Sequence, residues 1–136
     1  MLIRAALLAC CLVVPTAAHA AEKVAKKPVG TWMREAGGNK LRFAIKAETL
    51  TISLTTAEGS VAVEAAYGVT SDGTLFGVLT KVEKNDLEKG PKKGDLFSFD
   101  FDAGKSELTI SNLKGTRVPE EGGRIVEGVY SLEKKK

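Results

Sequence analysis

The sequence predicts an all-β domain, an eight-stranded antiparallel up-and-down barrel, and three observations support this prediction. Nearly every segment after residue 28 alternates between apolar and polar side chains, which is the pattern of a half-buried strand. Short turn-forming segments separate these runs, so consecutive strands are expected to pair antiparallel. No segment shows helical spacing with caps over enough length to predict a helix. Closing the strands into a barrel removes their exposed edges, and a two-sheet β-sandwich is the alternative.

The individual strands follow from changes in the alternation. Apolar residues occupy odd positions in the run 40–46 and even positions in the run 49–56, so a turn must separate two strands. The Ser-Asp-Gly sequence at 71–73 is a hairpin signal. The run 74–84 is apolar on both faces, which leaves its inward side open, and the run 95–102 alternates most clearly. The expected strands are Val29 to Glu35, Lys40 to Lys46, Thr49 to Thr56, Ser60 to Thr70, Thr74 to Lys84, Asp95 to Asp102, Ser106 to Leu113 and Arg124 to Leu132.

The lengths of the connections distinguish the two ends of the expected barrel. Loops alternate between the ends of an up-and-down barrel, so the two longest, residues 85–94 and 114–123, should frame one open mouth. Tight hairpins close the other end, from which the first strand enters. Acidic residues are interspersed among the basic residues of the mouth loops, which favours solvated loops over an anion-attracting rim. The basic residues singled out at the mouth are Lys89, Lys92, Lys93 and Arg117.

Residues 1–20 have the organisation of a secretory signal peptide, because Arg4 precedes a short apolar run that ends in small residues at Ala20. The run is shorter than the roughly 20 apolar residues of a membrane-spanning helix, and no later segment is longer. We therefore expect a secreted or periplasmic protein without a membrane span. The expected organisation is a signal peptide at 1–20, a linker at 21–28, the barrel at 29–133 and a polar tail at 134–136.

Both cysteines and the single histidine lie within the expected leader. A lipoprotein box ending at Cys10 is an alternative to simple secretion, but Arg4 leaves too short an apolar region before it. Cleavage would remove every thiol and imidazole, which disfavours disulfides, Ser-His-Asp and Cys-His catalysis and the usual zinc sites. We therefore expect no enzyme, no catalytic residue, no metal and no cofactor, with carboxylate-based hydrolysis left open.

The charge balance argues against one class of partner. The formal net charge is +3, and of the charged residues only Arg4 lies in the leader. Nucleic-acid binding calls for a basic stripe or patch, which this small excess does not provide, so no nucleic-acid partner is expected.

The first expected strand opens with Gly30-Thr31-Trp32, which resembles the Gly-x-Trp motif of the lipocalins and their calycin relatives, including the fatty-acid-binding proteins. The resemblance implies that Trp32, beside Gly30, plugs the hairpin end and packs under an arginine from near the last strand. Arg124 is the matching candidate and Arg117 the second. The chain lacks a Thr-Asp-Tyr motif, a C-terminal helix, a helical lid and an Arg-x-Tyr carboxylate clamp. It is most similar to small exported bacterial lipocalin-like domains of undescribed function.

An eight-stranded barrel is just wide enough to be filled by side chains or to hold one small ligand. Five phenylalanines favour filling, whereas the long loops favour a ligand. The first hypothesis is an exported lipocalin-like barrel that binds a small hydrophobic molecule in its lumen. The second is a filled barrel that acts through its surface as a protein-interaction or inhibitor module of the cell envelope. The candidate lumen residues are Phe43, Leu54, Tyr67, Phe97, Phe99 and Phe101.

Overall fold

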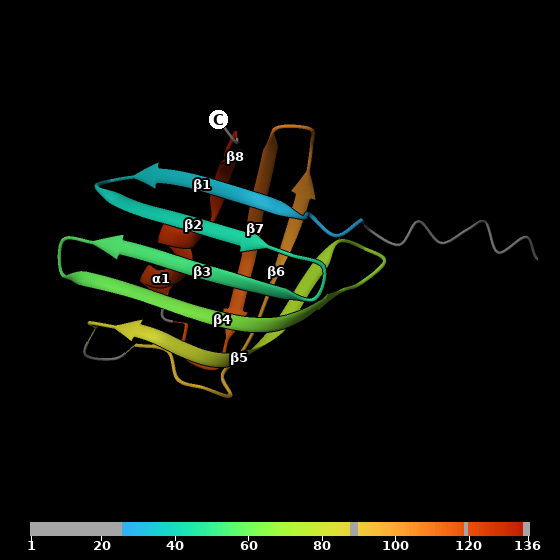
Figure 1. Ribbon diagram of the computed structural model, residues 1–136. Helices are drawn as coiled ribbons and strands as arrows, with labels where there is room; N and C mark the ends of the chain where they lie inside the picture. Colours follow the sequence, from blue (N-terminus) through green and yellow to red (C-terminus); the bar gives the residue numbers. More distant parts are fainter. Residues whose placement is uncertain (1–25, 88–89, 119, 135–136) are drawn as a thin grey trace, which may run out of the picture.

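The computed structural model describes residues 26–87, 90–118 and 120–134, which form a closed barrel of eight antiparallel strands in up-and-down order (Figure 1). This confirms the predicted fold class over its sandwich alternative. The expected leader, its Cys10 and the loop residue Lys89 lie outside the described residues. The elements are β1 (Gly30–Ala36), β2 (Asn39–Ile45), β3 (Thr49–Thr56), β4 (Gly59–Val69), β5 (Thr74–Asn85), β6 (Leu96–Ala103), β7 (Glu107–Gly115), α1 (Glu120–Val126) and β8 (Gly128–Leu132).

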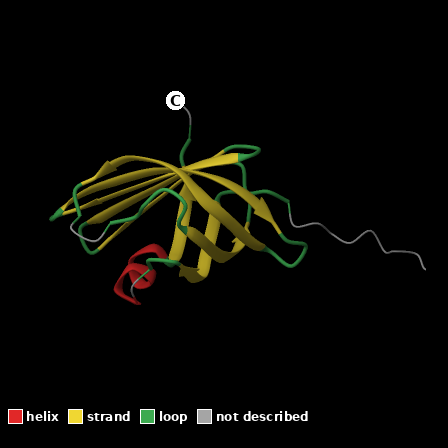
Figure 2. Cartoon of the chain, turned by 90° about the horizontal axis from the view of Figure 1, so that it is seen from below, coloured by secondary structure: helices red, strands yellow, loops and turns green. Residues whose placement is uncertain are grey.

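The strands form two groups that cross at a steep angle. β1 to β5 run side by side, whereas β6, β7 and β8 cross behind them, and α1 lies on the same side as these three strands (Figures 1 and 2). Short ladders join the groups: β5 pairs with β6 from Thr74 to Val78, and β1 pairs with β8 at Trp32 and Met33. Residues 34–36 of β1 and 80–85 of β5 extend toward the mouth beyond these two ladders, and there they pair with β2 and β4 alone. The barrel is therefore tied together nearer its hairpin end.

The core consists of the side chains that alternate inward along the strands. Phe43 lies at its centre, with its ring edge-on to Phe99 at 5.9 Å and to Tyr130 at 5.2 Å between centroids. Such edge-to-face pairs are a favoured aromatic geometry. Leu75 and Leu79 are buried, and they therefore define the inward face of the run 74–84, which the sequence left open. The buried residues are Trp32, Leu41, Phe43, Ile45, Leu50, Val61, Val63, Ala65, Leu75, Leu79, Phe99, Leu108, Ile110 and Tyr130.

The last expected strand requires a correction. A strand was predicted from Arg124 to Leu132, but β8 begins at Gly128 and residues 120–126 form α1. Arg124 in the last turn suits the helix dipole. Two glycines inside the helix lower its propensity and interrupt its pattern, which concealed it in the sequence. The expectation that the chain has no helical segment was therefore wrong at this loop.

Candidate functional site

The hairpin end is closed by Trp32, which is 3% exposed. Its indole Nε1 donates a hydrogen bond to the Pro28 carbonyl at 2.9 Å, so the segment before β1 satisfies the only polar atom of the ring. Gly30 has a φ of 147°, and a Cβ built there would lie 2.9 Å from Cδ1 of Leu132. Glycine is therefore required for the chain to enter β1 beside the indole.

The two arginines expected near Trp32 lie elsewhere. Arg124 is an exposed residue of α1, before the start of β8, whereas the β8 residue that pairs with Trp32 is Leu132, at the far end of that strand. The expected packing of Arg124 on Trp32 is thus wrong, because the segment 120–126 folds as a helix at the mouth. Arg117 lies in the β7–β8 connection, as a mouth-loop residue.

Three of the aromatic lumen candidates pack together inside the barrel, with Phe97 on the mouth side of Phe99. Phe43 and Phe99 are each 1% exposed, and the Phe97 ring stacks on Phe99 with centroids 6.3 Å apart. Gly77 makes room for Phe97, because a Cβ there would lie 2.6 Å from the Phe97 Cζ atom. The almost complete burial of Phe43 and Phe99 indicates that the centre of the barrel is packed with side chains.

The other two aromatic candidates lie near the hairpin end. The Tyr67 hydroxyl donates a hydrogen bond to the Lys46 carbonyl, and the Lys27 ammonium lies 5.2 Å from the centroid of the Tyr67 ring. Burial raises the pKa of Tyr67 above its ordinary value. Phe101 is half-buried beside the β4–β5 turn, where its backbone N–H donates to the Gly73 carbonyl. The Tyr67 hydroxyl and the Phe101 backbone thus each bind a turn at that end.

Toward the mouth, apolar side chains pack against the core while retaining accessible surface. On β3, Ile52 is only partly buried, whereas its register partners Phe43 on β2 and Val63 on β4 are almost fully buried. Leu54, a predicted lumen residue, follows it on β3 toward the mouth. We call this set the mouth layer: Ile52, Leu54, Val82, Leu87, Phe97, Leu113, Ile125 and Val126.

Two polar side chains of the barrel meet the end of α1 at the mouth. The half-buried Arg34 donates from Nη1 to the Ile125 carbonyl at 2.5 Å, and the Tyr130 hydroxyl donates to the Val126 carbonyl at 2.5 Å. Burial raises the pKa of Tyr130 strongly, and the positive charge of Arg34 opposes part of that shift. Gly128, with a φ of 143°, leaves room for the guanidinium, because a Cβ there would lie 2.5 Å from the Arg34 Nε atom.

Sequence reasoning missed Arg34. The available signal was its position two residues after Trp32, because the alternation of a strand places both side chains on the inward face. A charged residue at an inward position needs a polar partner. Here the partner is the end of a helix that the sequence did not predict.

The two long loops are joined by the one buried carboxylate among the described residues, Asp95, which is 8% exposed. Its Oδ2 atom accepts a hydrogen bond from the Lys92 backbone N–H at 2.9 Å, and its Oδ1 atom lies 3.1 Å from Nε of Arg117. Lys92 and Lys93 themselves are exposed. The predicted mouth loops thus lie together, with Arg117 engaged in holding one loop to the other.

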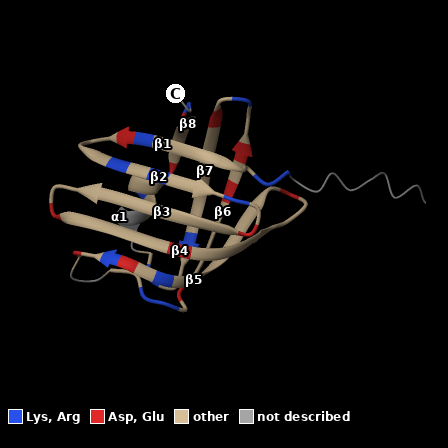
Figure 3. Ribbon diagram, in the orientation of Figure 1, with Lys and Arg blue, Asp and Glu red and all other residues tan. Residues whose placement is uncertain are grey.

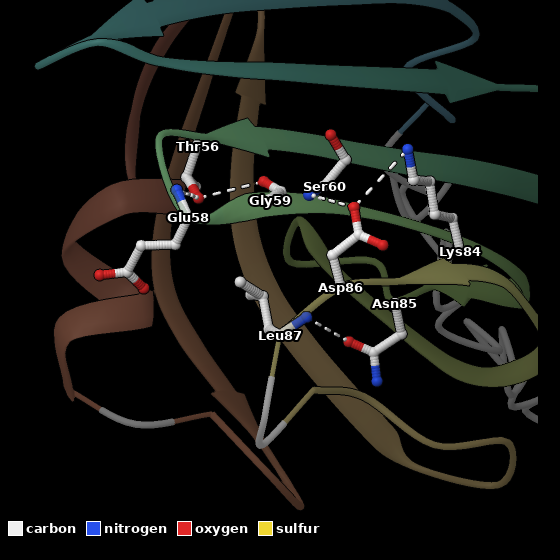
Figure 4. A network of polar contacts seen from close by, with 8 residues as sticks. All are labelled: Thr56, Glu58, Gly59, Ser60, Lys84, Asn85, Asp86 and Leu87. Atoms are coloured by element: carbon white, nitrogen blue, oxygen red, sulfur yellow. Dashed lines mark hydrogen bonds and ion pairs between the residues drawn. The ribbon is translucent and has the colours of Figure 1, made fainter.

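A second polar network fastens β5 to the β3–β4 hairpin (Figure 4). Asp86 accepts a hydrogen bond from the Ser60 backbone N–H at 3.1 Å, and the Lys84 ammonium lies 3.6 Å from the same carboxylate. The Leu87 N–H donates to the Asn85 side chain at 3.1 Å, which turns the chain back at the end of β5. This network positions Leu87 in the mouth layer.

Basic and acidic residues are interspersed along the strands and loops (Figure 3). Along β5, for example, the Lys81 ammonium lies 3.9 Å from the Glu83 carboxylate. In the described part of the chain, no group of three or more potential metal-ligating side chains comes together. Two large apolar side chains of β5 and β6 are exposed on this surface, Phe76 at 50% and Leu96 at 61%.

Asp100 is placed on the outer face of β6, where Thr74 Oγ1 and Asn112 Nδ2 each donate to its carboxylate at 2.8 Å. These two hydrogen bonds lower the pKa of Asp100. Asn112 has a φ of 51° and lies within the break in the β6–β7 register, because Ser98 pairs with Lys114 and Asp100 pairs with Ser111. The carboxylate therefore supports an irregular point of the sheet.

Comparisons with protein families, curated proteins and solved structures each returned no match. The closed up-and-down barrel is consistent with the lipocalin-like resemblance of the Gly-x-Trp segment, and no match establishes membership of that superfamily. Within residues 26–87, 90–118 and 120–134, no helix has the length and apolar character needed to cross a membrane.

Proposed function

We propose that this protein is an exported lipocalin-like carrier that binds one small hydrophobic molecule in the mouth layer. The supporting observation is that one group of apolar side chains at the mouth remains partly accessible. Phe43, Phe99 and Tyr130 in the core are almost inaccessible, whereas the mouth-layer side chains pack against that core and are only partly buried. The partly buried side chains at the hairpin end lie where the tight turns and Trp32 close the barrel. Apolar surface that remains accessible within a concave fold is a typical feature of a ligand site.

The packed centre limits the size of the ligand. Phe43, Phe99 and Tyr130 would stop a molecule entering from the mouth, so the ligand should be short or compact. Burial of apolar surface contributes about 25 cal/mol per Å². A micromolar dissociation constant corresponds to about 8 kcal/mol, so the complex must bury at least ~330 Å² of apolar surface, and more to offset the entropy of association.

The proposal assigns the protein no catalytic step and no cofactor. Arg34 and Tyr130, the polar side chains directed toward the mouth, already donate to carbonyls of α1. Export is proposed from the leader sequence, and it places the protein where a carrier for poorly soluble molecules would be useful. The partner class is thus a small apolar molecule.

A fluorescent hydrophobic dye, 1-anilinonaphthalene-8-sulfonate, tests the proposal with two matched variants on β3. Leu54→Trp adds bulk to the mouth layer, and Ser53→Trp adds the same bulk to the opposite face of the strand. We expect the first variant to weaken dye binding at least about tenfold, the effect of 1.4 kcal/mol, and the second to leave it unchanged.

Native mass spectrometry of the protein purified gently from its own host provides the complementary result. A reproducible co-purifying lipid-like mass supports the carrier. Absence of both a bound molecule and dye uptake, or equal loss of dye binding in the two variants, contradicts it. That outcome would favour the filled barrel that acts through its outer surface.

A further inference from the structure

The end of α1 is held by side chains of the barrel. The last carbonyls of a helix have no partner within the helix and must find one elsewhere. The Ile125 carbonyl accepts from Arg34 of β1, and the Val126 carbonyl accepts from Tyr130 of β8. These two hydrogen bonds span the seam where β1 and β8 no longer pair, and so connect α1 to both sides of the barrel.

Two side chains of α1 contact the core, among those that the structure describes. They are Ile125 and Val126, and both are only partly buried. After the helix, Glu127 Oε1 accepts a hydrogen bond from the Leu113 N–H at 3.0 Å, which fixes the chain to β7. A helix of seven residues is marginal in water without such support. The position of α1 therefore depends strongly on the two carbonyl contacts.

Because Ile125 and Val126 belong to the mouth layer, α1 covers part of the proposed binding site. A ligand that enters between the loops must displace these two side chains or pass beside them. Displacing them separates the carbonyls from Arg34 and Tyr130. Opening of the mouth by movement of α1 therefore requires that the two hydrogen bonds break.

We propose that α1 is a gate over the mouth layer and that Arg34 and Tyr130 form the latch that sets its closed position. The inference rests on the proposed function, because the gate controls access to that site. Arg34 and Tyr130 are positioning residues: they act on the ligand site through α1. Gly128 is part of the latch, because a larger residue at this position would occupy the place of the Arg34 guanidinium.

The test compares latch variants with controls of the same residue types. Arg34→Met removes the guanidinium and keeps an unbranched chain, and Tyr130→Phe removes only the hydroxyl from the aromatic cluster. The controls are Arg42→Met, at an exposed arginine on β2, and Tyr67→Phe, whose hydroxyl also donates to a carbonyl but at the hairpin end. Both arginine variants remove a guanidinium, and both tyrosine variants remove a phenolic hydroxyl. Within each pair only the place in the barrel differs.

Hydrogen exchange of the ligand-free protein, resolved by peptide, reports the latch directly. We expect the segment 120–127 to exchange roughly tenfold faster in Arg34→Met, and several-fold faster in Tyr130→Phe, given the usual strength of charged and neutral hydrogen bonds. Peptides of β2 and β3 should keep their rates, and the controls should leave the segment 120–127 unchanged. Unchanged exchange in the latch variants, or an equal increase throughout the barrel, would overturn the latch.

Dye-binding kinetics separate the gate from the binding site itself. If both proposals hold, the latch variants bind the dye several-fold faster than the parent and the controls do not. Dye binding at the mouth layer with equal association rates in all variants overturns the gate and leaves the carrier standing. Faster exchange of α1 without dye binding in any variant supports the latch and contradicts the carrier.

Discussion

The two ends of this barrel are held together by different kinds of interaction. At the hairpin end, Trp32 is buried under the chain that enters β1, and the strands on either side remain paired. At the mouth, β1 and β5 extend past their outer partner strands, and side-chain contacts such as Asp95 with Arg117 join the loops. The hairpin end is thus a structural base, whereas the mouth, where we propose that the ligand binds, is held by separate side-chain contacts.

The largest effect should follow from removing Trp32. We expect Trp32→Ala to reduce the free energy of unfolding by about 3 to 5 kcal/mol, because a large buried ring is replaced by a cavity. Leu54→Ala, a truncation of an accessible mouth-layer residue, should cost clearly less. Chemical denaturation measures both. Equal losses at the two positions would remove the distinction between the ends.

Gly128 tests how closely the mouth depends on the position of Arg34. Gly128→Ala should cost about 1 to 3 kcal/mol, because it combines a φ of 143° with a Cβ 2.5 Å from the guanidinium. Adding Arg34→Met to Gly128→Ala should recover the part that comes from the clash. Gly38→Ala, at a φ of 82° with no atom near the added Cβ, is the control for backbone strain alone. Urea denaturation measures the losses in free energy of unfolding. If the loss in the double variant equals the sum of the two single losses, the packing of Arg34 on Gly128 is contradicted.

Asp95 tests the connection between the two long loops. Asp95→Asn should lower the free energy of unfolding by about 1 to 2 kcal/mol, because the charge-assisted hydrogen bond to Arg117 is lost from a mostly buried carboxylate. Asp86→Asn, on an exposed carboxylate paired with Lys84, should cost less. Thermal unfolding compares the two variants. An equal or smaller loss for Asp95→Asn would show that this contact does not join the loops.

Tyr130 should make the protein sensitive to alkaline pH. Burial raises its pKa in the folded state, so the unfolded chain releases the proton first as the pH rises. The stability linked to Tyr130 is therefore complete below about pH 10, the value of the unfolded chain, and falls above it. Tyr130→Phe should show a smaller loss of stability between about pH 9 and 11 in urea denaturation. Parallel pH profiles for the two proteins would contradict the burial of this hydroxyl.

Asp100 should have the smallest effect, at acidic pH. Its hydrogen bonds to Asn112 and Thr74 lower the folded-state pKa, so the associated stability is present above the unfolded value and is lost as the pH falls through the folded value. Asp100→Asn should reduce the acid dependence of unfolding below about pH 4. The exposed Asp102 on the same strand provides the control. If the stability of Asp100→Asn falls with decreasing pH as steeply as that of the parent protein, the role of these hydrogen bonds is contradicted.

The strands were predictable because the alternation of apolar and polar residues follows directly from the burial of one face of each strand. The inward phenylalanines of β6 and the change of parity between β2 and β3 each leave a two-residue period that a buried face requires. The inward face of β5 was not predictable, because apolar residues occupy both of its faces. Leu75 and Leu79 became distinguishable from Phe76 only through the pairing of β5 with its neighbours.

The mouth was less predictable, because its structure depends on contacts between distant segments. The sequence identified the two loops that meet there, but not α1, whose glycines obscure a helix of only seven residues. The resemblance placed Arg124 over Trp32, whereas the arginine that points into the barrel is Arg34. A contact between residues 34 and 125 has no local signature in the chain.

Methyl-resolved nuclear magnetic resonance during titration with a small hydrophobic probe tests the central claim most directly. A ligand held in the mouth layer should shift the methyl signals of Ile52, Leu54, Val82 and Ile125 and leave those of Ile45 and Leu50, in the packed core, unchanged. Shifts confined to Leu96 and its surroundings on the outer face, or no saturable shifts at all, would contradict the claim that this barrel binds a small hydrophobic molecule at its mouth.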